Sequence, residues 1–342
     1  QEPAVAKALA YLDNKPLDDA LSLSLRCTVW LAAARKDRQY LSQLRRDAAE
    51  LIRIGAKREA DRPWTLLGVS AAAQAGIEVP QDYWWNALEH WLTTQRGDGG
   101  WSREPDGPTD TVLTAAGIAS IHACYEQLLS SASAYTQCRG GSDAALAMLP
   151  LQRGLACMTR SFVQALSGDE HPGWLLYAAT HVANAGGHRY FGDLNWSELG
   201  TRRLLALREN SGAFGGIVET SLAVVFLARS RQPVAMHRLR YDGDWNNRPE
   251  ALEALTRWLG QTFEAAYRWQ IVHLSAPVRE WHAAPILVIS GSTTPDFSEE
   301  DLARLRQYVL EGGMILSVTE CEGEGYRQGI REVIRRLFPR YP

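Results

Sequence analysis

Cys321 is the residue whose type and position most directly suggest chemistry. It follows a short apolar run, residues 314–319, and precedes a predicted helix, so it lies on the kind of strand-to-helix turn that exposes a nucleophile. A reactive thiolate also needs a nearby cation, commonly a histidine, but no histidine follows Cys321 and Glu320 and Glu322 flank it. Acidic neighbours disfavour the thiolate. A cysteine-dependent hydrolase therefore stays an alternative, with Cys321 as the candidate nucleophile.

Asp110 is the second candidate catalytic residue, at the start of a predicted helix over 109–128. A carboxylic acid that protonates a substrate usually has a second carboxyl group beside it or an apolar pocket around it. Asp110 has no adjacent acidic residue in the sequence, and a helix start is also where an aspartate caps backbone N–H groups. Asp110 is thus either a general acid or an N-cap.

Four polar residues follow two predicted strands and form a candidate ligand site. Asp242 and Asp244 come after the strand over 234–241, and Ser290 and Ser292 come at the end of the next buried strand but one. Ligands of an open parallel sheet bind beyond the carboxyl ends of its strands. A calcium loop would need a glycine and a glutamate that this stretch lacks, so we expect no metal and interpret the two aspartates as a turn that binds backbone amides.

Two sets of secondary-structure elements position these candidate residues, and the first set is helical. A 3.6-residue apolar period predicts ten helices before residue 230, in five pairs of one charged and one Ala- and Leu-rich helix. The charged members are 3–13, 40–55, 83–95, 149–165 and 196–210, and the apolar members are 20–34, 63–76, 109–128, 173–187 and 217–229. Such alternation predicts an all-α (α/α) toroid of about five helix pairs over residues 1–230, with the apolar helices inside. A long non-helical insert is expected over 130–144.

In a toroid the inner helices begin around one end of a central cavity. Their N-termini would favour an anionic group there. The candidate ligand-binding residues at these helix starts are Asp19, Arg62, Trp64, Asp110, Thr111, His171, Trp174, Glu219 and Thr220. Aspartates and threonines at these positions are alternatively N-caps. His122 and His181 lie on inner helices, where they either face the cavity or are hydrogen-bonded core residues.

The second set of elements begins near residue 231, where the apolar period changes to that of strands. Strands are expected over 234–241, 270–275, 285–290 and 314–319, with helices over 249–264, 298–311 and 325–337. This order predicts a small α/β domain, flavodoxin-like or amidotransferase-like, over residues 231–342 with a mostly parallel sheet. Four strands are few for this class, so we expect a C-terminally incomplete domain.

Two glycine-rich turns carry a resemblance for the helical region. Residues 95–101 (QRGDGGW) close one predicted helix and residues 208–214 (RENSGAF) close another in the same register. Residues 109–117 (TDTVLTAAG) form the helix start that follows the first turn. Together, these segments resemble the QW repeats and the following inner helix of the squalene-hopene cyclase and protein prenyltransferase β-subunit superfamily. Residues 240–246, 284–291, 308–313 and 337–339 resemble a bacterial domain of unknown function related to class I glutamine amidotransferases and the ThuA-like fold.

The departures from these families bear on function. The cyclases protonate an alkene with a D-x-D-D run that this sequence lacks, and Val112 stands where the prenyltransferases place a zinc-binding cysteine two residues after Asp110. The five cysteines form no CxxC pair. We therefore expect no metal and no cofactor.

Composition limits the partners. A net charge of −3 argues against nucleic acid, and no apolar stretch is long enough to span a membrane. The Gln1 start fits signal-peptide removal, which would make the protein exported or periplasmic; otherwise it is cytoplasmic. The sequence favours a binding or assembly protein for a small hydrophobic or anionic ligand or a protein partner. The alternatives are an enzyme acting on an isoprenoid or glycan in the toroid cavity, and a cysteine-dependent hydrolase or amidotransferase.

Overall fold

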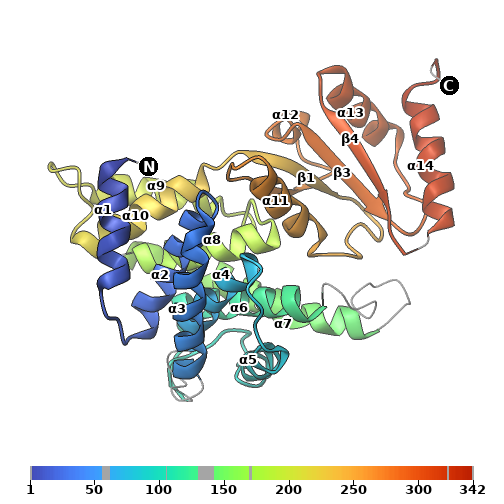
Figure 1. The fold of residues 1–342 in the computed structure, drawn as a ribbon. Helices are drawn as coiled ribbons and strands as arrows, with labels where there is room; N and C mark the ends of the chain where they lie inside the picture. The colour runs from blue at the N-terminus through green and yellow to red at the C-terminus, as the bar shows by residue number, and fades with distance from the viewer. Residues whose placement is uncertain are drawn as a thin grey trace.

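The chain folds into an all-helical region followed by a small α/β domain (Figure 1). The structure is a computed structural model that describes residues 2–55, 62–104, 106–129, 142–168, 172–321 and 323–340. The fold class expected from the sequence, helices first and then a parallel sheet with helices, is confirmed.

Each of the ten predicted helices is present. They are α1 (Pro3–Asn14), α2 (Ala20–Ala34), α3 (Leu41–Gly55), α4 (Arg62–Gln74), α5 (Gln81–Thr93), α6 (Thr111–Leu129), α7 (Ser142–Gly168), α8 (Gly173–Gly186), α9 (Trp196–Leu207) and α10 (Ile217–Ser230), with a short 3-10 helix at Arg38–Tyr40. α7 starts seven residues earlier than predicted, because Pro150 lies inside it and not at its first turn. Residues 142–144, predicted as part of the insert, belong to α7, and the rest of the predicted insert, residues 130–141, falls outside the described part of the chain.

The even-numbered helices form one layer of the helical region, which is well buried in α2, α4, α6 and α8 and less so in α10. α2, α4, α6, α8 and α10 contact one another in sequence order. The alanine pairs 33–34, 71–72, 115–116 and 178–179 on four of them are at most 9% exposed. Small side chains let neighbouring helices approach closely. The expectation that the Ala-rich segments of these four helices are buried is confirmed, and the toroid itself stays a prediction.

The first glycine-rich turn binds this layer to the outer helices. Trp101 is 2% exposed, and its indole Nε1 donates to the carbonyl of Trp91, 2.9 Å away. A Cβ on Gly117 of α6 would lie 2.9 Å from the Trp101 ring, so only glycine permits this contact. The tryptophan therefore braces two helices and does not line a ligand site.

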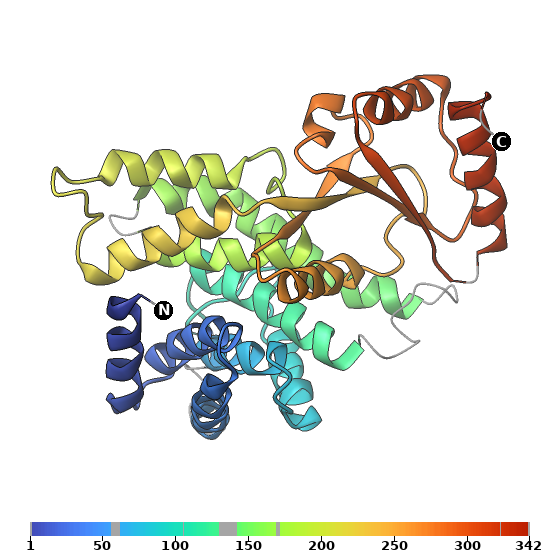
Figure 2. The same ribbon diagram turned by 45° about the horizontal axis from the view of Figure 1, so that its top comes forward.

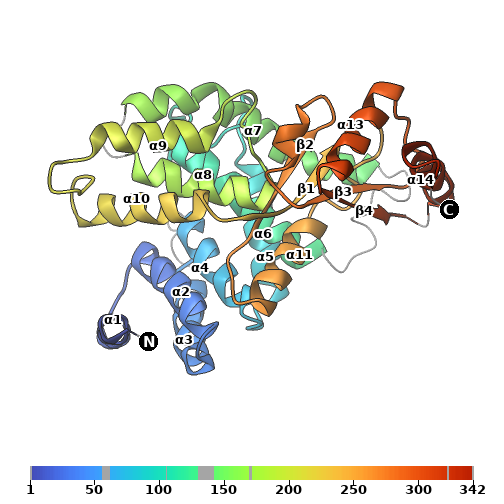
Figure 3. The same cartoon turned by 90° about the horizontal axis from the view of Figure 1, so that it is seen from above.

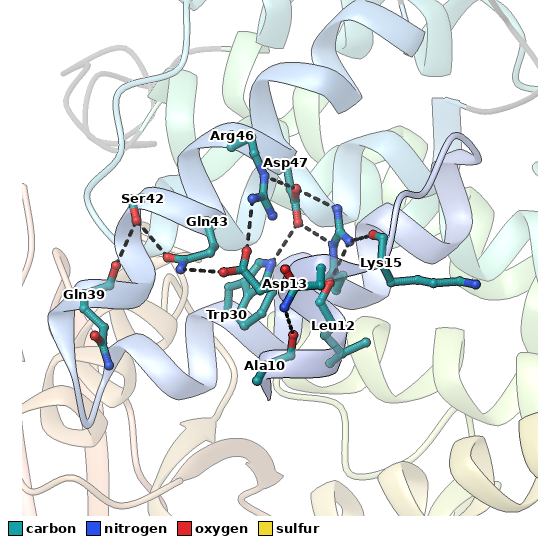
Figure 4. A network of polar contacts seen from close by, with 12 residues as sticks. Ala10, Leu12, Asp13, Lys15, Trp30, Gln39, Ser42, Gln43, Arg46 and Asp47 are labelled. Atoms are coloured by element: carbon teal, nitrogen blue, oxygen red, sulfur yellow. Dashed lines mark hydrogen bonds and ion pairs between the residues drawn. The ribbon is translucent and has the colours of Figure 1, made fainter. Parts of the chain in front are cut away.

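A buried ion pair fixes α2 against α3 (Figure 4). Arg26 donates from Nε and Nη2 to the two carboxylate oxygens of Asp47, at 2.6 and 2.9 Å. The indole of Trp30 donates to the same carboxylate at 2.8 Å. Arg26 also donates to the carbonyls of Leu12 in α1 and of Lys15 directly after α1, so one guanidinium joins three helices.

The α/β domain has four parallel strands in the order β2-β1-β3-β4. The strands are β1 (Val234–Arg240), β2 (Arg268–His273), β3 (Ile286–Gly291) and β4 (Met314–Thr319). The connecting helices are α11 (Ala251–Thr262), α12 (Val278–Trp281) and α13 (Glu299–Leu310), and α14 (Glu324–Leu337) follows β4. The four-residue α12 is too short for the sequence period to reveal.

The two faces of the sheet differ. α12, α13 and α14 pack together and cover one face with a core that includes Leu239, Leu287 and Tyr308. α11 packs on the other face, where Leu252 forms a core with Met236, Trp269 and Val288 of the strands. Figures 1 to 3 place α11 between the sheet and the helical region, next to α8. α11 thus belongs to the α/β domain and also contacts the helices.

Candidate ligand site between the helical region and the α/β domain

α11 closes one end of the layer of even-numbered helices. Arg257 on α11 forms an ion pair with Glu126 near the end of α6, and Glu250 just before α11 lies 3.3 Å from Nδ1 of His122. On the sheet, the backbone N–H of Ile271 in β2 donates to the carbonyl of Gly187, which follows α8, at 2.8 Å. Charged and backbone contacts therefore hold the two regions together.

A chamber of about 240 Å³ lies between α11 and the five even-numbered helices. The residues that line it come from the carboxyl-terminal parts of those helices and from α11 and the chain that follows it. Its charged and histidine side chains are Arg35, His122, Glu126, His181, Arg229, Glu250, Glu253, Arg257 and Arg268. This lining is strongly polar for a space between Ala-rich helices.

A larger chamber of about 730 Å³ adjoins the first. The two share His122, Ala185 and Glu250, so the His122–Glu250 contact lies at their common wall. Aromatic rings of the α/β domain, Trp245 and Trp269, line the larger chamber together with arginine, histidine and carboxylate side chains. A few polar groups among apolar and aromatic walls is the usual composition of a ligand site.

Burial sets the charge of Glu253 in the smaller chamber. Removal from water raises its pKa to about 8, and the nearby charge of Glu250 adds to this rise. Arg257 lies 3.3 Å from Glu253 and would favour its ionised form, but the same guanidinium is in closer contact with Glu126. The Trp269 indole also donates to Glu253, at 3.0 Å, without cancelling the cost of burial. Glu253 is therefore largely protonated at neutral pH.

Two histidines beside the chambers are held neutral. Burial, and then the charge of Arg229, lowers the pKa of His181 to about 3. Its Nε2 lies 3.0 Å from Nη1 of Arg229 and accepts a hydrogen bond from that guanidinium. Burial, and then the neighbouring His122, lowers the pKa of His188 to about 3. Neutral imidazoles act here as hydrogen-bonding groups.

The residues predicted at the helix starts have other roles. Asp19 caps α2 by accepting from the N–H of Ser22 at 2.7 Å, and Asp110 caps α6 by accepting from Leu113 at 2.9 Å and from Nε of Arg103 at 2.6 Å. The capping interpretation of both aspartates is confirmed. Neither residue lines either chamber.

The other helix-start residues are only partly brought together. Trp64 and Trp174 form an edge-to-face pair with ring centroids 5.2 Å apart. Thr111 donates to Ser161 at 2.9 Å, and Glu219 lies in the first turn of α10. None of these four residues lines either chamber. His171 lies outside the described residues, as does the side chain of Arg62.

At the carboxyl edge of the sheet, the protein's own carboxylate binds the loop after β3. Asp244 accepts from the backbone N–H groups of Ser292 and Thr293, at 2.8 and 3.0 Å, and from both hydroxyls. These hydrogen bonds lower the pKa of Asp244 against the opposing effect of burial, which is the larger single contribution. Ser290 donates to the carbonyl of Trp245 at 2.9 Å, and Asp242 is exposed. Asp244, Ser290 and Ser292 are thus brought together as a loop clasp.

Cys321 is the second residue after β4 and precedes α14, in the turn that the sequence predicted. Its φ of 57° is in the left-handed region that disfavours side chains, which is a feature of strained nucleophile turns. Its sulfur is bonded in a disulfide. A disulfide sulfur is no thiolate nucleophile, so a cysteine-dependent reaction at this turn requires reduction first.

Sequence reasoning missed the residues that line the smaller chamber, apart from the two histidines. Arg35, Glu126 and Arg229 are rare charges on the apolar helices, and each lies at or near the carboxyl end of its helix. Their shared position at the carboxyl ends of the apolar helices is the sequence signal that could have indicated a polar site there. The partner residues on α11 could not be found in this way, because nothing in their own helix indicates which region it contacts.

Neither a metal-binding cluster nor a membrane-spanning helix is found within the described ranges. Within them, no group of three or more His, Cys, Asp or Glu side chains could hold a metal ion. No described helix has the length and apolar character needed to cross a bilayer.

The α/β domain matches a known family. Residues 235–342 match the family model of a domain of unknown function, DUF4159. The match covers nearly all of β1 and the rest of the domain, and it does not extend into the helical region. No curated protein and no solved structure matches the chain.

Proposed function

We propose that this protein is a binding or assembly protein that holds its ligand in the two chambers between the helical region and the α/β domain. In this proposal the helical region is a cyclase-like toroid without its parent catalytic groups, and the α/β domain is a degenerate amidotransferase-like domain. The observation that carries the proposal is convergence: polar side chains from α4, α6, α8, α10 and α11, together with Arg35 directly after α2, line one chamber.

The state of the candidate catalytic residues supports binding over catalysis. Both oxygens of Asp110 accept hydrogen bonds within the protein, one of them from a guanidinium. Cys321 is in a disulfide. Each group that could have attacked or protonated a substrate has a structural partner instead.

The lining of the chambers supports a polar ligand. An isoprenoid gains affinity from apolar walls, whereas buried charges such as Arg257 and Glu250 lose hydration when a hydrocarbon covers them. The enzyme hypothesis for an isoprenoid therefore receives no support from these walls. The cysteine-dependent alternative is favoured by one observation, the left-handed φ of Cys321.

Thermal unfolding and turnover of the full chain separate these hypotheses. A panel of small polar metabolites is screened for compounds that raise the unfolding temperature, since a ligand that binds the folded state stabilises it. We expect the effect of a true ligand to be lost in His122→Ala, at the wall between the chambers, and kept in His90→Ala on α5.

The same preparations are incubated with polyprenyl and squalene-type substrates, before and after reduction. Turnover that Asp110→Asn abolishes would establish the isoprenoid enzyme and overturn the binding proposal. Hydrolase or amidotransferase activity that appears only on reduction and is lost in Cys321→Ser would overturn it in favour of the cysteine-dependent alternative.

A further inference from the structure

Arg35, which is exposed, and Arg229, which is half-buried, both line the smaller chamber without a carboxylate partner. Arg35 follows the last residue of α2, and Arg229 lies in the last turn of α10. Among the described residues, no carboxylate oxygen lies within 4.0 Å of either guanidinium. Arg229 instead donates to His181 and lies over the Tyr177 ring, 5.7 Å from its centroid.

The two guanidinium groups repel each other. Partial removal from water on the chamber side, and then the charge of Arg229, lowers the pKa of Arg35, although the residue is exposed on its other side. Burial, and then the charge of Arg35, lowers the pKa of Arg257 to about 10, although Arg257 has Glu126 and Glu253 as partners. The carboxyl ends of α2 and α10 offset part of this repulsion, because their last carbonyls carry about half a negative charge each.

The chamber as a whole carries an excess of positive charge. Four arginines and three glutamates line it, and one of those glutamates, Glu253, is largely protonated at neutral pH. Glu126 is occupied by Arg257, and Glu250 faces His122. None of the three glutamates has a carboxylate oxygen within 4.0 Å of the Arg35 or Arg229 guanidinium.

We propose that Arg35 and Arg229 bind an anionic group of the ligand, a carboxylate or a phosphate. This inference rests on the proposed function and names the ligand chemistry of its smaller chamber. Guanidinium groups bind such anions through paired hydrogen bonds, and two from different helices bind one anion with defined geometry. A space of about 240 Å³ accepts one such group, and the adjoining chamber of about 730 Å³ accepts the remainder of the ligand.

The proposal has a consequence for the ligand-free protein. If the arginines were structural, their removal would lower the unfolding temperature. If they are an unfilled anion site, Arg35→Gln removes a repulsion and raises the unfolding temperature in chloride buffer. Arg35→Lys keeps the charge and should stay close to the parent protein.

Calorimetric titration of the full chain with inorganic phosphate and, separately, with acetate tests the anion site. Ionic strength is matched with chloride throughout, because general screening would otherwise imitate binding. We expect saturable binding of at least one of the two anions, weakened about tenfold or more in Arg35→Gln and in Arg229→Gln. Arg202→Gln, which removes an exposed arginine on α9, should leave it unchanged. The anion that binds more tightly identifies phosphate or carboxylate as the ligand's charged group.

Three results would overturn the inference: a lower unfolding temperature of ligand-free Arg35→Gln, absence of saturable binding of both anions, or equal binding by the parent protein and both chamber variants. Each of these results leaves the proposed function standing if a metabolite from the panel still stabilises the protein through His122. Conversely, isoprenoid turnover through Asp110 would overturn the proposed function whatever the phosphate titration shows.

Discussion

Replacement of Asp47 by alanine tests the packing that places α2, and with it Arg35, at the chamber. Asp47 is 2% exposed and accepts hydrogen bonds from Arg26, from the indole of Trp30 and, at 3.1 Å, from Nε of the more exposed Arg46. Its removal leaves the guanidinium of Arg26, itself 6% exposed, with only two carbonyl acceptors in a buried place (Figure 4). The indole N–H of Trp30 loses its acceptor at the same time.

The expected cost follows from these contacts. Removing one partner of a buried ion pair costs about 3–5 kcal/mol, because the remaining charge stays buried without a partner. An unsatisfied indole adds about 1–3 kcal/mol, and the two terms overlap because they share one carboxylate. We expect Asp47→Ala to lower the free energy of unfolding by about 4–5 kcal/mol.

Asp13→Ala is the matched control. Asp13 also pairs with an arginine, Arg46, but the two side chains are 37% and 51% exposed, and such pairs contribute about 1 kcal/mol or less. Urea unfolding is followed by tryptophan fluorescence and by circular dichroism, so that separate transitions of the two regions are seen. If Asp47→Ala costs no more than Asp13→Ala, the buried pair does not hold α1, α2 and α3 together and the reasoning is wrong.

Three further changes test the contacts around the site. Gly187→Ala should lower the unfolding temperature more than Gly76→Ala. Both glycines have a positive φ, which costs about 1–2 kcal/mol for any side chain, but only at Gly187 would a Cβ lie 2.4 Å from an aromatic ring, that of Trp269 in β2. Equal effects would mean that the helical region and the α/β domain are not held together at Gly187. Asp244→Ala should destabilise the protein by about 2–3 kcal/mol in urea unfolding, whereas exposed Asp242→Ala should be near neutral; similar values would refute the clasp. The pKa of Glu253 is raised in the folded protein, to about 8 from the ordinary 4.5. Its contribution to the free energy of unfolding is therefore fully present below about pH 4.5 and is lost as the pH rises through 8. Glu253→Gln should therefore flatten the unfolding temperature between pH 5 and pH 8, and an unchanged slope would show that the carboxyl is ordinary.

The helical region was predictable because its period and its alanines act locally. The alanine pairs at 71–72 and 115–116 lie on helices with few charges, and burial is the only arrangement that satisfies such helices. The start of α7 was missed because Pro150 usually marks a first turn, and the tertiary packing of a longer helix overrode that local signal.

The location of the site was less predictable. The sequence places Asp19 and Asp110 at helix starts correctly, but it does not tell at which end of the helical layer the second domain lies. That end is set by long-range contacts such as Arg257 with Glu126 and Ile271 with Gly187. These join residues far apart in the chain, which no local period encodes.

A crystal structure of the protein with a stabilising polar metabolite tests the central claim most directly. The account predicts electron density between α6, α8 and α11, beside His122 and the guanidinium groups of Arg35 and Arg229. Density at the opposite ends of the same helices, between Trp64 and Trp174 or beside Asp110, would contradict it.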